Sequence, residues 1–226
     1  MPPPYPPPPG GGFPPPVGTP PPAFGAKGTL QDFLRNAQTV VTKPAVASFD
    51  AAKSFAGWNT ILLTVGIASG IRGVLGAISS RYVNAAVFGF GKKALVAYNP
   101  VSIFAYDTIG TFIGFFIGVG ILYLIARAFK GTGDFLTYAH ALALISVPVT
   151  AISAVLGLIP ILGGLAAMAL GIYAIYLAIL ATVSTHQLPM DRAVWVVLIP
   201  VLVGAVLAFC VIAAASAALI ALTHAG

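Results

Sequence analysis

The chain has 226 residues and a formal charge of +6, and 58% of its residues are apolar while only 7% are charged. A soluble domain carries about 25% charged residues, so this composition cannot build a water-soluble surface. The basic residues stand singly or in pairs at the ends of apolar runs, where they set orientation and meet anionic lipid headgroups. Composition therefore indicates an integral membrane protein and argues against nucleic-acid binding.

Residues 1–26 hold thirteen of the nineteen prolines. A segment with so little apolar surface cannot offset the entropy of ordering and favours polyproline II or coil. We therefore expect residues 1–26 to be a disordered Pro/Gly-rich tail. Pro2-Pro3-Pro4-Tyr5 spells a WW-domain ligand, but such matches are expected by chance here, which favours a solvated tether.

Residues 27–56 have the pattern of short amphipathic, interfacial helices. From Thr29, apolar residues recur at helical spacing and polar residues occupy the other face. Thr29 is placed to cap this helix, and Asp32 in its first turn suits the helix dipole. Pro44 is expected to start a second short helix over residues 45–56. Two placements stay open: packing on the protein's own membrane domain, and anchoring at the membrane surface with the lysines near the headgroups.

Residues 57–226 form a series of apolar runs, each long enough for a bilayer core that takes about 20 helical residues to cross. The expected spans are residues 58–78, 101–126, 135–156, 161–183 and 193–214. The predicted fold is an all-α integral membrane protein, a five-transmembrane-helix bundle with N-terminal amphipathic helices and a disordered Pro-rich tail. Residues 83–91 are apolar enough to dip into the membrane, which leaves a sixth, partial segment open.

Basic residues near the span ends are unequally divided, and translocation disfavours them. With a cytosolic N-terminus, the inner side has seven: Lys27, Arg35, Lys43, Lys53, Arg127, Lys130 and Arg192. The outer side then has three: Arg81, Lys92 and Lys93. We therefore expect the N-terminus in the cytosol, and five spans place the C-terminus on the far side.

Three ionisable residues fall inside spans, where charge is costly and often functional: Arg72, Asp107 and His140. Arg72 and Asp107 each lie six residues from the outer end of their span. At the rise of an α-helix both are about 9 Å deep, which predicts an ion pair between them. The alternative is that each side chain separately reaches the interface.

Glycines recur at four-residue intervals in the first two spans and strip one face of each helix of side chains, which suits close helix packing in lipid. They are Gly66 and Gly70, continued by Gly73 and Gly76, in the first span, and Gly110, Gly114 and Gly118 in the second. We expect packing between spans of one chain rather than a dimer face, because five spans must first find one another.

Catalytic and metal-binding motifs are missing from the sequence. It has no HExxH, GxSxG or GxxxxGK[ST] motif and no cluster of Cys or His residues. We therefore expect a protein that is not an enzyme and that carries no cofactor and no metal.

Three segments of the sequence form a familiar pattern. They are residues 122–136, which contain Gly131-Thr132-Gly133-Asp134-Phe135, residues 173–193, which contain His186-Gln187-Leu188-Pro189, and residues 40–44 with Phe49. In the first, a helix with a basic end meets a Gly-x-Gly loop, and Pro148 follows about a dozen residues into the next helix. Together these segments resemble the Yip family, named for Ypt/Rab-interacting proteins, over roughly residues 38–215.

The resemblance implies five spans, a cytosolic N-terminus and a far-side C-terminus. Eukaryotic relatives are implicated in Golgi and endoplasmic-reticulum vesicle traffic through Rab GTPases and in membrane shaping, but their Tyr-Asp-Leu-x-Gly-Pro segment is missing here. The proline-glycine tail and alanine-rich spans suit a bacterial member in the cytoplasmic membrane, with an endomembrane as the eukaryotic alternative.

The expected function is that of a non-enzymatic polytopic membrane protein of Yip type that organises the membrane or partner proteins. Its expected partners are the lipid bilayer and either another membrane protein or a second copy of the chain. The alternative is a small transporter or channel that uses the ionisable residues inside the spans.

Overall fold

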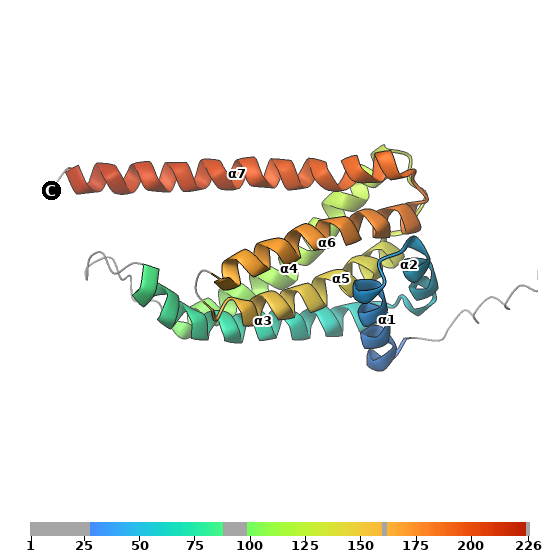
Figure 1. Cartoon of the computed structure of the whole chain (residues 1–226), viewed down its shortest axis with the longest axis horizontal. Coiled ribbons are helices and arrows are strands. Elements are labelled where there is room, and N and C mark those ends of the chain that lie inside the picture. Colours follow the sequence, from blue (N-terminus) through green and yellow to red (C-terminus); the bar gives the residue numbers. More distant parts are fainter. Residues whose placement is uncertain (1–27, 88–98, 160–161, 225–226) are drawn as a thin grey trace, which may run out of the picture.

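The structure is a computed structural model that describes residues 28–87, 99–159 and 162–224, and its regular elements are helices (Figure 1). In chain order they are α1 Leu30–Thr42, α2 Val46–Ala52, the 3-10 helix η1 Lys53–Phe55, α3 Trp58–Val87, α4 Pro100–Ala128, α5 Phe135–Leu156, α6 Leu162–His186 and α7 Met190–His224. Helices α3 to α7 run along the long axis, and α1 and α2 lie across one end. The predicted tail, residues 1–26, lies outside the described residues.

Five helices are long and apolar enough to cross a membrane, which confirms the predicted architecture. Their spanning stretches are Trp58–Ser79, Pro100–Ala128, Phe135–Leu156, Leu162–His186 and Met190–Val211. Helix α3 continues to Val87, beyond the expected end of the first span. The apolar segment 83–91 is therefore helical over residues 83–87, and the rest of it lies outside the described residues.

Local cap chemistry explains where several helices begin. The Thr29 side chain accepts a hydrogen bond from Asp32 N at 3.2 Å, and the Asp32 carboxylate accepts one from Thr29 N at 3.0 Å. This reciprocal capping box confirms the predicted start of α1. Asp134 caps α5 in the same manner by accepting from Thr137 N at 2.9 Å, and Asn99 caps α4.

The core lies at the end of the bundle where α1 and α2 cross the start of α5 and the end of α6; we call this the collar end. Helix α1 buries Phe33, Ala37 and Val40 there. Eight consecutive residues of α5, from Tyr138 to Ile145, are buried, so this part of α5 is surrounded on all sides. Tight packing is therefore concentrated at the collar end.

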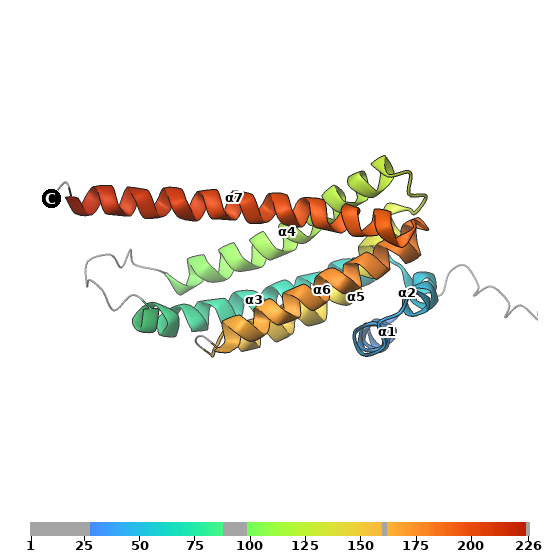
Figure 2. The ribbon, with the colours of Figure 1, turned by 45° about the horizontal axis from the view of Figure 1, so that its top comes forward.

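Helix α4 packs on α3, whereas α7 stands apart from the other spans over much of its length (Figure 2). Every residue of α7 from Val201 to Val211 whose side chain the structure describes is exposed. These faces are apolar, as contact with lipid requires. The end of the bundle away from α1 is therefore open between α4 and α7.

Helices α3 and α4 meet at Gly73 and Gly76 rather than along all the predicted glycines. A Cβ added to Gly73 would lie 2.8 Å from Phe104 O, and one on Gly76 would strike the Asp107 carboxylate. At the other predicted positions an added Cβ has open space or, at Gly66, one contact at 4.0 Å: Gly66, Gly70, Gly110, Gly114 and Gly118. The first two spans do pack on each other, through Gly73 and Gly76, while α4 diverges from α3 toward the collar end (Figure 2).

Gly73→Ala should destabilise the protein, while Gly70→Ala on the same helix should not. The added methyl group at position 73 meets the backbone of α4, and overpacking of this kind costs about 1–3 kcal/mol. At position 70 it meets nothing within 4 Å. Thermal unfolding in one detergent compares the two variants, and equal midpoints would contradict the close contact at Gly73.

Candidate functional site

The loop between α4 and α5 folds back onto the last turn of α6. Gly131 N donates to Ala126 O at 2.8 Å, which closes the end of α4, and Thr132 N donates to His186 O at 3.1 Å. The loop thus supplies a donor to a carbonyl at the C-terminus of α6, where intrahelical partners run out. It joins the end of α4 to the end of α6.

The two glycines of this loop are required by how closely it approaches α6. A Cβ on Gly131 would lie 2.8 Å from both Cβ and Nδ1 of His186. A Cβ on Gly133 would lie 2.9 Å from the carbonyl carbon of Thr185 and would strike its oxygen. The Gly-x-Gly segment and His186 therefore contact each other, although they lie in different predicted segments of the sequence.

Beneath this loop, α5 and α6 are joined by a buried hydrogen bond. The hydroxyl oxygens of Tyr138 and Thr182 are 2.8 Å apart, and Thr182 Oγ1 itself donates to Ala178 O at 2.8 Å. Tyr138 is therefore the donor to Thr182. The ring of His186 packs edge-on against Tyr138, with 4.6 Å between centroids. These contacts fix α5 against α6.

His140, one of the predicted ionisable candidates, lies under α1. Its ring meets Phe33 edge-on at 5.9 Å and is almost completely buried. Neither ring nitrogen of His140 has a hydrogen-bond partner among the described residues. His140 is thus a packing residue of the interface between α1 and α5.

A polar cluster ties α2 and η1 to α6; we call Asp50, Lys53 and Ser184 the α2 clamp. Lys53 Nζ donates to Asp50 Oδ1 at 2.6 Å and to Ser184 O at 2.9 Å, and Ser184 Oγ donates to Asp50 Oδ1 at 2.7 Å. Burial raises the pKa of Asp50, but the hydrogen bonds from Lys53 and Ser184 lower it by more, so the pKa lies below its ordinary value. Sequence reasoning missed this cluster.

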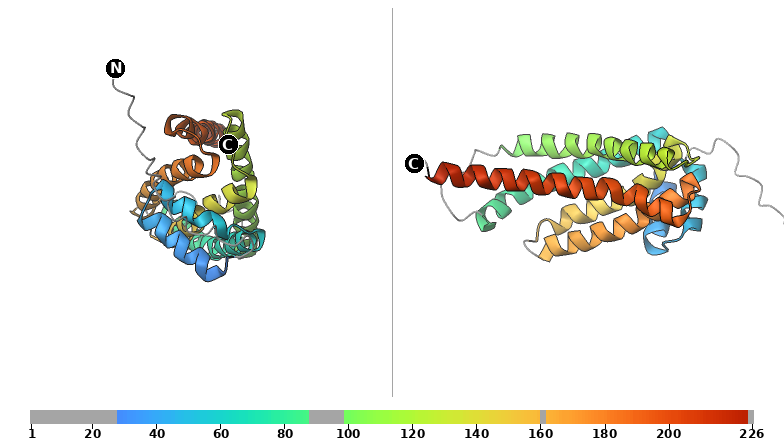
Figure 3. Two further views of the ribbon diagram at one scale, coloured as in Figure 1. Left: turned by 90° about the vertical axis from the view of Figure 1, so that its right-hand side faces the viewer. Right: turned by 90° about the horizontal axis from the view of Figure 1, so that it is seen from above.

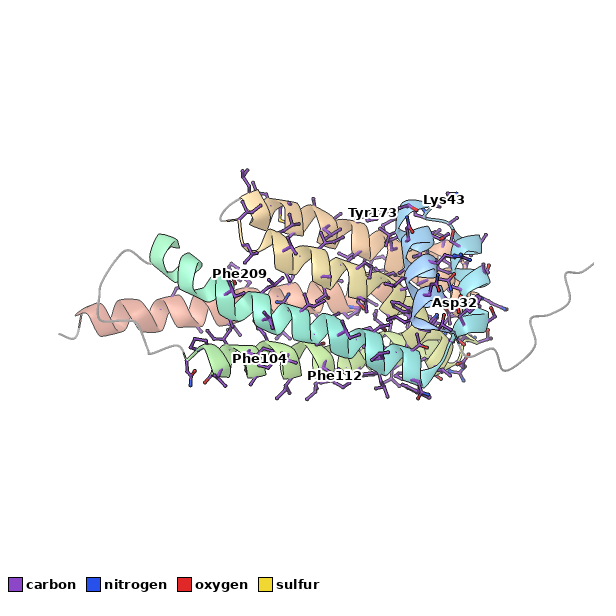
Figure 4. All side chains as sticks on the ribbon, turned by 90° about the horizontal axis from the view of Figure 1, so that it is seen from below. Asp32, Lys43, Phe104, Phe112, Tyr173 and Phe209 are labelled. Atoms are coloured by element: carbon purple, nitrogen blue, oxygen red, sulfur yellow. The ribbon has the colours of Figure 1, made fainter. Side chains whose placement is uncertain are left out.

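Two further hydrogen bonds hold the N-terminal helices on the bundle. Tyr173 of α6 donates to Val41 O at 2.7 Å, and Thr60 of α3 donates to Gly28 O at 2.9 Å. Figure 4 shows Tyr173 beside the Lys43 end of α1. The sequence left two placements open for the N-terminal helices. In the structure they pack on the protein's own membrane domain.

The predicted ion pair between Arg72 and Asp107 is wrong. Among the residues that the structure describes, Lys53 and Asp50 form a salt bridge, and Arg72 and Asp107 do not. Arg72 is exposed on α3, while Asp107 packs against Gly76, one turn further along α3. Gly73 and Gly76 are the residues of α3 that meet α4, whereas Arg72 lies on an exposed face of the helix, so the pair fails because the two side chains do not face each other.

Comparison with family models gives one match, to the Yip1 domain, over residues 39–212. The chain belongs to the Yip1 domain family. None of the curated proteins and none of the solved structures compared with the chain matches it. The Yip1 domain here runs from within α1 into α7, so it includes the α2 clamp, the loop over α6 and His186.

Asp50→Asn should loosen α2 from α6 at pH 7, because Lys53 then loses the carboxylate that neutralises it. Amide hydrogen exchange in α2 should rise up to about fivefold, since a half-exposed ion pair is worth about 0.2–1 kcal/mol. Folding lowers the pKa of Asp50 below 3.8, so its contribution is present above that pH and is lost as pH falls through the folded pKa. Asp191→Asn, on the exposed start of α7, is the control. Unchanged exchange in Asp50→Asn would contradict the clamp.

Proposed function

We propose that this Yip1 domain protein is non-enzymatic and organises the membrane around it, with α1 as a wedge in one leaflet. The observation that carries the proposal is the divided apolar face of α1. Phe33, Ala37 and Val40 are buried on the bundle, while Leu30 is 42% exposed and Leu34 is 57% exposed. Helix α1 is therefore fixed to the spans and still has apolar surface to offer to lipid.

The depth of α1 suits this role. Phe33 touches His140, which lies five residues into α5 and so about 8 Å from the start of that helix. Amphipathic helices at a membrane surface bury their apolar face roughly 5–10 Å into the boundary between headgroups and acyl chains. An α1 held at that depth displaces lipid from one leaflet only, which favours curvature.

Charge supports a cytosolic collar end. The basic residues exposed there are Arg35, Lys43, Arg127, Lys130 and Arg192. Basic residues accumulate on the cytosolic side of membrane proteins and are attracted to its anionic lipids. This orientation places the wedge in the cytosolic leaflet and the C-terminus on the far side.

The positions of the ionisable residues favour an organiser over a transporter. Arg72 is exposed on α3, Asp107 lies between α3 and α4, and His140 lies under α1. Two cavities lie among the spans: a groove between α4 and α7, and a smaller pocket between α3, α4 and α5. None of the three ionisable residues lines either cavity. A transport path built on these residues would need them to line a common cavity.

Reconstitution into liposomes that contain anionic lipid tests the wedge. The wild-type protein should reduce vesicle diameter as the ratio of protein to lipid rises, measured by electron cryomicroscopy. The double variant Leu30→Gln, Leu34→Gln should reduce the diameter less, because the glutamine side chains do not enter the acyl region as the leucines do. Gln31→Ala and Gln38→Ala, on the polar face of the same helix, are the matched control.

Two results would contradict the proposal. One is that the wild-type protein, the variant with Leu30→Gln and Leu34→Gln, and the control with Gln31→Ala and Gln38→Ala all give vesicles of the same diameter. The other is ion flux across the same vesicles that is lost in Asp107→Asn or His140→Gln, which would instead support the transporter.

A further inference from the structure

An open groove of about 510 Å³ lies between α4 and α7, with α5 and α6 as its floor. Figure 3, which looks along the bundle in its left view, shows α7 (red) above α6 (orange) and α4 (green) to their right. Gly114 and Gly118 leave part of the α4 wall free of side chains, and Val201 of α7 contributes to the opposite wall. The lining is apolar apart from Ser146 and Thr150, and its volume is in the range of small-molecule sites.

A second pocket of about 210 Å³ lies behind the groove, between α3, α4 and α5. Four hydroxyl side chains line it: Ser69, Thr111, Ser146 and Thr150. Phe115, Ser146 and Thr150 line both spaces, so the apolar groove and the hydroxyl pocket are neighbours that share these three side chains as a wall. Ser69 and Ser146 each lie eleven residues into their helix, about 17 Å from its start, which is near the middle of a bilayer core about 30 Å thick.

The hydroxyl groups of Ser69 and Ser146 are buried and have no hydrogen-bond partner among the described residues. Elsewhere in the spans Thr64 Oγ1 donates to Thr60 O at 2.7 Å and Thr182 Oγ1 to Ala178 O at 2.8 Å, whereas the hydroxyl groups of Thr108 and Thr185 resemble the two serines in having no partner among the described residues. An unpaired polar group in the hydrocarbon region is costly. These two serines thus have unused hydrogen-bonding capacity beside the pocket, with their oxygens covered by neighbouring atoms.

We propose that the groove and the hydroxyl pocket together bind one neutral lipid. Its apolar chain lies in the groove, and its uncharged hydrogen-bonding group, a hydroxyl or an ester carbonyl, meets Ser69 and Ser146. No charged residue lines either space, and a phosphate at this depth would have no counter-ion, so the site selects lipids without a charged headgroup.

The chemistry of the pocket favours a lipid over a second copy of the chain. A helix is about 10 Å across and could cover the groove, but its apolar side chains would leave both serines unpaired. A single chain with a polar end reaches past Phe115 and satisfies them. Diacylglycerol has this chemistry and serves as the probe.

The full chain is placed in nanodiscs with a diacylglycerol that carries a photoreactive group and an alkyne in one chain. Cross-linked peptides should come from α4, α5 and α7. Ser146→Ala should lower labelling roughly three- to tenfold, as expected for one hydrogen bond in the membrane. Thr150→Val removes a second hydroxyl group at nearly constant shape. Ser153→Ala, on the same helix but outside both spaces, should label as wild type does.

Gly118→Leu tests the groove separately, because Gly118 lines it and a Cβ added there meets nothing within 4 Å. Labelling should fall as far as in Ser146→Ala. Gly110→Leu, two turns away on α4 and outside the lining, is the matched control. Thermal midpoints show that each variant is folded.

Three results would overturn the proposal. The first is equal labelling by a phosphatidylcholine probe with the same chains, which would mean unselective lipid contact. The second is wild-type labelling in Ser146→Ala, Thr150→Val and Gly118→Leu. The third is cross-linking between two copies of the chain through α4 that Gly118→Leu abolishes while diacylglycerol labelling persists.

Discussion

The close approach of the loop over residues 131–133 to the last turn of α6 is the contact on which the rest of the structure depends. Gly133 faces the Thr185 carbonyl, where backbone meets backbone, and Gly131 faces the side chain of His186. Lipid provides no hydrophobic force to drive helices together, so close packing and hydrogen bonds must hold them. This contact brings α4, α5 and α6 together at the collar end.

The other polar contacts of the collar end follow from this position of α6. Once its last turns are fixed, Thr182 can accept from Tyr138, and Ser184 can bind Asp50 and Lys53 of the α2 clamp. The clamp holds α2 and thereby α1. One end of the bundle is consequently tied by a connected set of hydrogen bonds, while α4 and α7 diverge and leave an apolar groove. The proposed wedge and the proposed lipid site lie at these two contrasting regions.

Features that depend on local sequence could be predicted. Five spans follow from apolar length, and the start of α1 follows from the chemistry of Thr29 and Asp32, which lie three residues apart. The Gly-x-Gly loop and His186 were both singled out through the resemblance to the Yip family. Their mutual contact could not be predicted, because nothing local pairs residues more than fifty positions apart.

Features that depend on which faces of two helices meet could not be predicted. The pairing of Arg72 with Asp107 assumed that the two side chains face each other, whereas Gly73 and Gly76 are the residues of α3 that meet α4, and Arg72 lies on an exposed face. The α2 clamp joins Asp50 and Ser184 across 134 positions of the chain. Its one local signal is the spacing of Asp50 and Lys53, three residues apart, which is typical of any ion pair on a helix.

Equilibrium unfolding of Gly133→Ala in mixed micelles, compared with Gly164→Ala, tests the contact between loop and helix most directly. The methyl group at position 133 meets the Thr185 backbone, whereas that at position 164 meets nothing within 4 Å. Gly133→Ala should lose about 1–3 kcal/mol of unfolding free energy, and Gly164→Ala should stay within about 0.5 kcal/mol of wild type. Equal stability of the two variants would contradict the central role of this contact.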